Sequence, residues 1–340
     1  MKKIYKYLSI ALVVTFGMVI LSTNVSASEY YKENPQIVKI KKTVAKYKDE
    51  TKKVHKGYYR KNNFVKVSSV QGHTLKTASG YYISANKNFV KKTQGYQNPK
   101  RYHQVNYTQI KPYGKVGHSI GVGYEGIKTY KVMKRLGTYN GYNKYNYATK
   151  YAVQNFQRKH HIKATGRVNE KTWVKLGLKK SQWKSIDSYV APLGAKAWQG
   201  RKAHVDAAIK QAKRYLGNLY LVGSSSYPFY GTDCSGLVMQ ALYAGGINPK
   251  PVSSIHHGYP GNEWNSRNLF KDNKFKRVSY SHRQRGDLIF YYQPGTRTVW
   301  HVALYLGHNQ VIESWPPRVM IQPIKNSQRS IIAGVSRPWN

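Results

Sequence analysis

Three hydrophobic patterns follow one another along the 340-residue chain. Residues 28–92 contain short runs of β-branched and aromatic residues separated by Gly, Asn and Ser, which is typical of strands joined by turns. Residues 93–122 carry Gly, Pro and Asn without a sustained period, which indicates a linker. From residue 123 the apolar positions recur three and four residues apart, the period of a buried helix face. The pattern predicts a small β-rich module followed by a helical one.

The helical pattern extends over residues 123–178. Its longest helix is predicted to bury Ala148, Tyr151, Ala152 and Phe156. Asn169 is expected to cap a further helix that buries Trp173 and Leu176. Residues 179–199 contain several large apolar side chains, and we expect this connector to pack against a neighbour.

The last part of the chain combines helical and strand-like patterns of apolar residues. Residues 201–216 have the spacing of an amphipathic helix with a buried face of Val205, Ala208, Ile209, Ala212 and Leu216. Thr232 or Asp233 can cap a second helix, which ends at Gly245-Gly246. The buried face of this second helix is expected to contain Leu237, Val238, Ala241 and Leu242. Strand-like runs follow, so the pattern predicts an α+β domain.

The first 27 residues have the pattern of a secretory signal peptide. Lysines precede an apolar run from Leu8 to Leu21, and small residues at Val25 and Ala27 frame a cleavage site. The run is short for a membrane span, which needs roughly 20 apolar residues, and no later segment is long and apolar enough to span. We therefore expect cleavage after Ala27, export, and no transmembrane anchor.

Composition adds an extreme positive charge. The formal net charge is +44, and no Asp or Glu occurs between residues 51 and 124. Such a field attracts polyanions. Because export argues against nucleic acid as a partner, we expect association with a cell wall of the Gram-positive type, including anionic wall polymers such as teichoic acids.

Cys234 is the chain's only cysteine. In an exported protein a lone cysteine forms no internal disulfide and is either a buried small hydrophobe or a reactive thiol. The predicted helix places it in the first turn, where the helix dipole favours a thiolate. The neighbouring Asp233 opposes this unless its carboxylate is turned towards another group, for which a positively charged substrate group is one candidate.

A cysteine that cleaves amides needs a histidine and a group that orients it. His301 and Glu313 lie in two strand-like runs that are predicted to form a β-hairpin. A two-residue turn at His308-Asn309 would place them on opposite faces, whereas a three-residue turn that begins at Gly307 would place them on one face. The catalytic interpretation therefore predicts the three-residue turn.

The ordered segments "DCSGL", "GDLIF" and "HVALYLG" followed by "VIES" resemble the NlpC-type cysteine peptidases of bacterial cell walls, over about residues 200–340. The resemblance implies a papain-like α+β fold in which the helix that bears the cysteine packs on an antiparallel sheet. It implies that Cys234 is the nucleophile, His301 the general base and acid, and Glu313 the orienting residue. The residues expected to line the subsite for the free amino end of a stem peptide are Tyr220, Asp233 and Ser235.

Two further features bear on this resemblance. The third catalytic position is often histidine in the family, but a carboxylate such as Glu313 can also orient an imidazole. No metal or organic cofactor is required, and the pair His256-His257 lacks the carboxylates or cysteines that would accompany a metal site.

The preceding modules carry resemblances of their own. Residues 123–178, with "AVQNFQRKHHIKATGRVNEKTWVKLG", resemble the small three-helix peptidoglycan-binding domain, which implies peptidoglycan as a partner. Residues 28–92 resemble, in composition and rhythm, the tyrosine- and lysine-rich wall-attachment modules of lactobacillus-type surface-layer proteins.

Three functions are compatible with these features. The first is a secreted endopeptidase that cleaves peptidoglycan stem peptides between γ-D-glutamate and the diamino acid through a thioester. The second is an N-acetylmuramoyl-L-alanine amidase, which would not need a site for a free amino end. The third is a catalytically silent wall-binding or adhesive protein.

Overall fold

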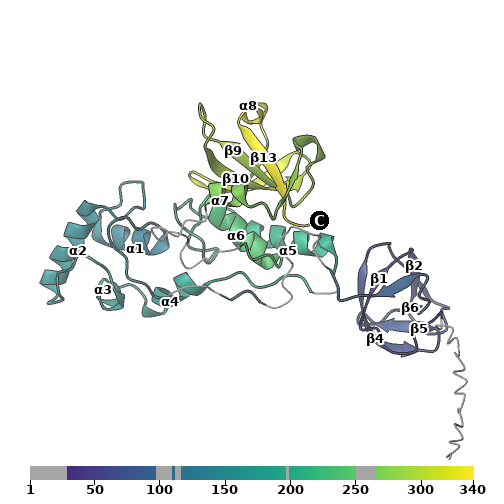
Figure 1. Ribbon diagram of the computed structural model, residues 1–340. Helices are drawn as coiled ribbons and strands as arrows, with labels where there is room; N and C mark the ends of the chain where they lie inside the picture. Colours follow the sequence, from purple (N-terminus) through teal and green to yellow (C-terminus); the bar gives the residue numbers. More distant parts are fainter. Residues whose placement is uncertain (1–28, 97–108, 112–115, 197–198, 250–256, 258–264) are drawn as a thin grey trace, which may run out of the picture.

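A computed structural model describes residues 29–96, 109–111, 116–196, 199–249, 257 and 265–340. The predicted signal peptide, most of the predicted linker and His256 lie outside these ranges. Figure 1 shows a β-sheet module at one end, helices α1 to α4 at the other, and a helix–sheet domain between them. Within the described ranges, no helix is long and apolar enough to cross a membrane.

The N-terminal module contains one antiparallel seven-stranded sheet in the order β3-β2-β6-β5-β4-β1-β7. Its strands are β1 (Ile37–Ile40), β2 (Val44–Tyr47), β3 (His55–Tyr59), β4 (Phe64–Gln71), β5 (Thr74–Thr77), β6 (Tyr82–Ser84) and β7 (Val90–Lys92). Alternate residues such as Val38 and Ile40 fill an apolar core, because successive side chains of a strand point to opposite faces.

The helical module consists of α1 (Ile127–Leu136), α2 (Tyr147–Lys159), α3 (Glu170–Lys175) and α4 (Lys180–Ser188). The side chain of Asn169 accepts the Thr172 N–H at 2.9 Å, which confirms the predicted cap. Trp173 and Leu176 are buried in the module core, as expected. The connector also packs as expected, because Trp183 of α4 is buried in the same core.

The predicted buried face of α2 is wrong at Ala148 and Tyr151, whereas Ala152 and Phe156 are half-buried and Phe156 packs against the module core. Ala148 and Tyr151 are exposed, and the buried residues are Thr149, Val153 and Gln157. Two of these three are polar, and their hydrogen bonds are made inside the module: Gln157 Nε2, for example, donates to the Arg167 carbonyl at 2.8 Å. The spacing of apolar residues does not detect a buried helix face whose polar side chains are hydrogen-bonded.

The C-terminal domain places helices on an antiparallel six-stranded sheet in the order β12-β11-β10-β9-β13-β8. Its strands are β8 (Lys276–Val278), β9 (Leu288–Tyr292), β10 (Val299–Gly307), β11 (Gln310–Trp315), β12 (Arg318–Pro323) and β13 (Ile332–Arg337). Its helices are α5 (Arg201–Lys213), α6 (Cys234–Ala244), α7 (Ser266–Lys271), α8 (Asn326–Arg329) and the short 3-10 helix η2 (Tyr280–His282). This arrangement confirms the predicted α+β class, with the cysteine-bearing helix packed on the sheet (Figure 1).

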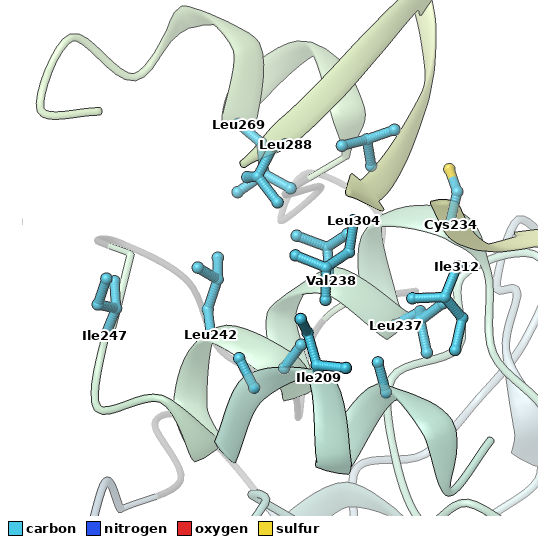
Figure 2. Packing of buried hydrophobic residues seen from close by; sticks show 14 of the residues in the cluster. Ile209, Cys234, Leu237, Val238, Leu242, Ile247, Leu269, Leu288, Leu304 and Ile312 are labelled. Carbon is cyan, nitrogen blue, oxygen red and sulfur yellow. The ribbon is translucent and has the colours of Figure 1, made fainter. Parts of the chain in front are cut away.

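Helix α6 is buried along its whole length. Figure 2 shows Leu237, Val238 and Leu242 packed among residues of α5 and the sheet, with Cys234 at the beginning of the helix. All four residues of the predicted buried face of α6 are confirmed. For α5 the prediction is wrong at Leu216, which lies beyond the end of the helix and is exposed.

Gly236 permits the closest contact of α6 with the preceding loop. A Cβ atom at this position would lie 2.0 Å from the Ser224 carbonyl oxygen. We expect Gly236→Ala to lower the free energy of unfolding by about 3 kcal/mol or more, because a fixed backbone atom must move. Chemical denaturation measures this change.

Gly200→Ala is the matched control for Gly236→Ala. Gly200 is the N-cap of α5, has a φ of −87°, and its added Cβ would meet no atom closer than 3.6 Å. We expect a loss below about 1 kcal/mol there. Equal losses of unfolding free energy at both glycines would show that the close contact between α6 and the loop does not require a glycine.

Candidate active site

The position of Cys234 is fixed by the cap of α6 and by a bond from the sheet. Asp233 is the N-cap, and its Oδ1 accepts the Gly236 N–H at 2.7 Å. The Ser314 hydroxyl of β11 donates to the Thr232 carbonyl at 2.6 Å. The beginning of the helix is therefore tied directly to the strand that carries Glu313.

His301 and Glu313 form a buried pair on neighbouring strands. His301 Nε2 bonds to Glu313 Oε2, and Gln322 Nε2 of β12 donates to Glu313 Oε1. His301 also interacts with the Cys234 side chain, and this interaction raises the pKa of His301. Because Nε2 is taken by Glu313, Nδ1 is the ring nitrogen that serves Cys234. The structure thus brings the three predicted catalytic side chains into one chain of contacts.

The predicted turn of the hairpin is wrong, although the predicted pairing of its strands holds. Gly307 pairs with Gln310, so the turn has two residues, His308 and Asn309, with φ of 49° and 58°. A bulge between Tyr305 and Gly307 adds one residue to β10 and restores the pairing of Leu304 with Ile312. The length of the turn alone therefore does not determine which residues of the two strands pair.

The charges of the pair are strongly coupled. Burial lowers the pKa of His301, but the hydrogen bonds with Cys234 and Glu313 outweigh it and raise that pKa to about 9. Burial raises the pKa of Glu313, but the bond with His301 outweighs it, and the net effect lowers that pKa. At neutral pH the pair is therefore an imidazolium and a carboxylate, and an imidazolium stabilises a neighbouring thiolate.

These shifts predict a loss of stability at alkaline pH. A histidine whose pKa is raised by folding stabilises the folded state fully below its unfolded pKa of about 6.5, and this contribution disappears as the pH rises to about 9. The expected loss is on the order of 3 kcal/mol. Melting temperatures across this range should fall for the wild type and fall much less for His301→Gln. Parallel curves for the two proteins would contradict the assigned pKa.

The carboxylate of Asp233 already accepts several hydrogen bonds from within the protein. Besides capping α6, it accepts the Ser235 hydroxyl at 3.0 Å and the Gly223 N–H at 2.7 Å. His257 Nε2 lies 2.9 Å from Oδ1 and 3.0 Å from Oδ2. Burial raises the pKa of Asp233, but His257 and these hydrogen bonds outweigh it and lower that pKa.

His257 is a residue of this site that the sequence did not reveal. The sequence places it in a Gly- and Pro-rich segment and suggests metal binding as its only role. No local pattern indicates that His257 lies at the beginning of α6. In the part of the chain that the structure describes, no group of three or more His, Cys, Asp or Glu side chains could hold a metal ion.

Tyr220 lies half-buried beside the other predicted residues. Its N–H donates to the Pro317 carbonyl at 2.9 Å. Burial raises its pKa, as do the charges of Cys234, Asp233, Tyr142 and Glu125, so it remains a phenol that can donate a hydrogen bond. Tyr142 and Glu125 belong to the helical module, which the sequence did not connect with this site.

A groove of about 570 Å³ opens beside the His301–Glu313 pair. Trp315 contributes to its wall and contacts the His301 ring edge-on, with ring centroids 4.9 Å apart. Trp300 and Lys325 also line it. A groove of this size accepts a segment of a bound molecule next to His301.

Three known families match separate parts of the chain. Residues 217–331 match the NlpC/P60 family, residues 131–176 match a peptidoglycan-binding domain, and residues 30–90 match a domain of unknown function, DUF5776. The first two matches confirm the resemblances to an NlpC-type cell-wall peptidase and to a peptidoglycan-binding domain. The wall-attachment role of the β-rich module stays a prediction.

Individual relatives are more distant. The chain is 31% identical over 99 residues to the peptidoglycan endopeptidase RipA of Mycolicibacterium smegmatis, a match that covers 28% of this chain and 16% of that protein. An NlpC/P60 family protein from Bacillus cereus is 17% identical, with 89% of this chain and 63% of that chain covered and a TM-score of 0.34. The P60 domain of the Mycobacterium avium paratuberculosis antigen MAP1272c is 22% identical, with 40% and 93% covered and a TM-score of 0.30.

Proposed function

We propose that this chain, which carries an NlpC/P60 domain beside a peptidoglycan-binding domain, is a secreted cysteine endopeptidase that cleaves peptidoglycan stem peptides. The bond cleaved joins the γ-carboxyl of D-glutamate or D-isoglutamine to the diamino acid. The observation that carries the proposal is the chain of contacts from Cys234 through His301 to Glu313.

The first half of the reaction forms a thioester. The Cys234 thiolate attacks the γ-carbonyl carbon, and the carbonyl electrons move onto its oxygen. Backbone N–H groups at the beginning of α6 and the Tyr220 phenol stabilise this oxyanion. The C–N bond then breaks, and the His301 imidazolium gives its Nδ1 proton to the leaving amine of the diamino acid.

The second half releases the peptide. A water molecule gives a proton to His301 Nδ1 while its oxygen bonds to the thioester carbon, and the C–S bond breaks. The thiolate is regenerated beside the imidazolium. Glu313 remains ionised throughout and holds Nε2, so that Nδ1 always faces the sulfur.

The amidase remains the nearest alternative, but Asp233→Ala is a poor test between the two. This substitution removes a helix cap and leaves the Gly223 and Gly236 N–H groups without their acceptor, so it destabilises the fold under either function. The fragments released from peptidoglycan distinguish the two reactions directly.

Mass spectrometry of the fragments released from purified peptidoglycan tests the proposal, with Cys234→Ala as control. We expect peptides that end at D-glutamate or D-isoglutamine, absent with the variant. Free stem peptides that begin with L-alanine would replace the proposal by the amidase. Wall binding without any released fragment would favour the silent, adhesive function.

We further propose that the positive charge holds the protein on anionic wall polymers such as teichoic acids. The net charge of +44 and the complete absence of Asp and Glu from residues 51–124 support this proposal. Attraction between exposed charges is screened over about 8 Å at physiological ionic strength. Binding to intact walls should therefore weaken with salt and with prior extraction of teichoic acids.

A further inference from the structure

The groove beside the His301–Glu313 pair lies on the side of the leaving group. His301 lines it, whereas Cys234 is not part of its described lining. In the proposed reaction the His301 imidazolium protonates the amine that leaves, so this amine lies within hydrogen-bond distance of the ring. The glutamyl part of the substrate is then bonded to the Cys234 sulfur. The groove is therefore placed to hold the amino acid that departs with the amine.

Apolar and aromatic side chains form much of the groove wall. Trp300 and Trp315 meet edge-to-face with ring centroids 5.2 Å apart, and Met320 and Ile331 add aliphatic surface. Trp300 is 40% exposed, so part of its ring is open to a ligand. The aliphatic carbons of a diamino acid can pack against such walls. These contacts give affinity, but they do not select the charge of the ligand.

Lys325 supplies the net charge of the groove. His301 and Glu313, the other two charged side chains of its described lining, form an imidazolium–carboxylate pair whose charges cancel. Both oxygens of Glu313 are bonded, one by His301 and the other by Gln322. Burial raises the pKa of Glu313, and the charge of Lys325 is among the groups that lower it, so this cation acts on the pair. A ligand in the groove therefore meets an excess of one positive charge.

The ammonium group of Lys325 is open to a ligand. Lys325 is exposed, and Ser327 and Gln328, which can also donate hydrogen bonds, line the groove beside it. Within the described residues, the Lys and Arg side chains of this domain that form ion pairs with carboxylates are Arg201, Lys202, Arg285 and Arg337. An ammonium group has three N–H donors, and a carboxylate accepts about four hydrogen bonds. This end of the groove therefore suits a carboxylate.

We propose that Lys325 binds a carboxylate group of the departing amino acid and so determines which stem peptides are cleaved fastest. The inference rests on the proposed endopeptidase function and adds a specificity-determining residue to it. Two groups have this chemistry: the α-carboxylate of a diamino acid that ends its peptide, and a carboxylate on the side chain of the diamino acid. In the first case a carboxypeptidase reaction must first remove the residues that follow the diamino acid.

Three peptides separate these two sources. The first is L-Ala-γ-D-Glu-L-Lys with a free terminal carboxylate, and the second is the same peptide with a terminal amide. The third contains diaminopimelate in place of lysine, with only its α-carboxyl group amidated. A preference of wild type for the first peptide over the second assigns the α-carboxylate, and a preference for the third over the second assigns the side-chain carboxylate.

Steady-state kinetics on these peptides measure the role of Lys325. Wild type should prefer a carboxylate peptide over the second peptide by about 5- to 20-fold in kcat/KM. The difference should lie mainly in KM, because this carboxylate does not change in the reaction. Lys325→Met should lose the preference and should cleave the second peptide about as well as wild type does. Because Lys325 is exposed, high salt should also reduce the preference.

Arg329→Gln is the matched control, because Arg329 is an exposed cation of α8 outside the described lining of the groove. This variant should keep the preference of wild type. If wild type cleaves all three peptides equally well, the inference is overturned. An equal loss of Lys325→Met on all three peptides would overturn it too, because Lys325 would then act through Glu313 alone. Both results leave the endopeptidase standing.

Binding to an inactive variant tests the inference independently of cleavage. Calorimetry would compare the affinities of Cys234→Ala and of Cys234→Ala/Lys325→Met for the three peptides. Tighter binding of a carboxylate peptide that disappears with Lys325 would support the inference. Equal affinities for all three peptides would overturn it. If wild type cleaves none of the peptides, the proposed function fails, and the calorimetry still decides the role of Lys325.

Discussion

Cys234→Ala is expected to reduce peptide cleavage by on the order of 10⁴-fold or more. The thioester cannot form without the sulfur, and no second cysteine exists in the chain to replace it. The side chain is small and lies at the first position of α6, so the fold should survive its truncation. Release of the diamino acid from the peptide L-Ala-γ-D-Glu-diamino acid, followed by chromatography, measures the loss.

Folding and wall binding are the controls for this variant. Its melting temperature and its binding to purified peptidoglycan should match those of wild type, because the binding module is untouched. Residual cleavage within about tenfold of wild type would mean that the reaction does not use Cys234.

Glu313→Gln is expected to lower kcat by about 10²- to 10⁴-fold. Glutamine has nearly the same shape, but it bears no charge to stabilise the imidazolium, and its amide can hold the wrong tautomer of His301. Because the charge of Glu313 helps to raise the pKa of His301, its removal should move the alkaline limb of the rate profile to lower pH. Initial rates from pH 5 to 10 measure both effects.

Gln322→Met is a milder variant for comparison with Glu313→Gln. Gln322 donates to Glu313 Oε1, whereas His301 bonds to Oε2, so the loss of Gln322 should loosen the carboxylate without removing its charge. We expect a loss of about tenfold with the alkaline limb little changed. An unchanged profile for Glu313→Gln would show that Glu313 does not control the protonation of His301.

The sequence predicts those parts of the site that depend on local patterns. Short-range rules predict the cap at Asp233 and the helix that begins at Cys234. They also predict the strands of His301 and Glu313, and the structure contains all of these elements. The family resemblance then supplies their expected roles. The bulge in β10 is different, because it depends on how two strands adjust to each other over several residues.

Features that depend on long-range contacts were not predictable from pattern. His257 reaches Asp233 across 24 positions of sequence, and Asn143 reaches Val222 across 79. Nothing in either segment encodes the partner. For the same reason the sequence pattern does not indicate the polar face of α2, because Gln157 is buried through hydrogen bonds with Gly166 and Arg167.

We propose that Cys234 is the nucleophile and that the His301 imidazolium activates it. The pH dependence of Cys234 alkylation by iodoacetamide is a direct measurement of this activation. Intact-mass measurements on wild type and His301→Ala would give the rates from pH 5 to 9. Wild type should label rapidly already at pH 6, and the variant should label as an ordinary thiol does, whose pKa is about 8.5. Labelling of wild type only above about pH 8 would contradict it.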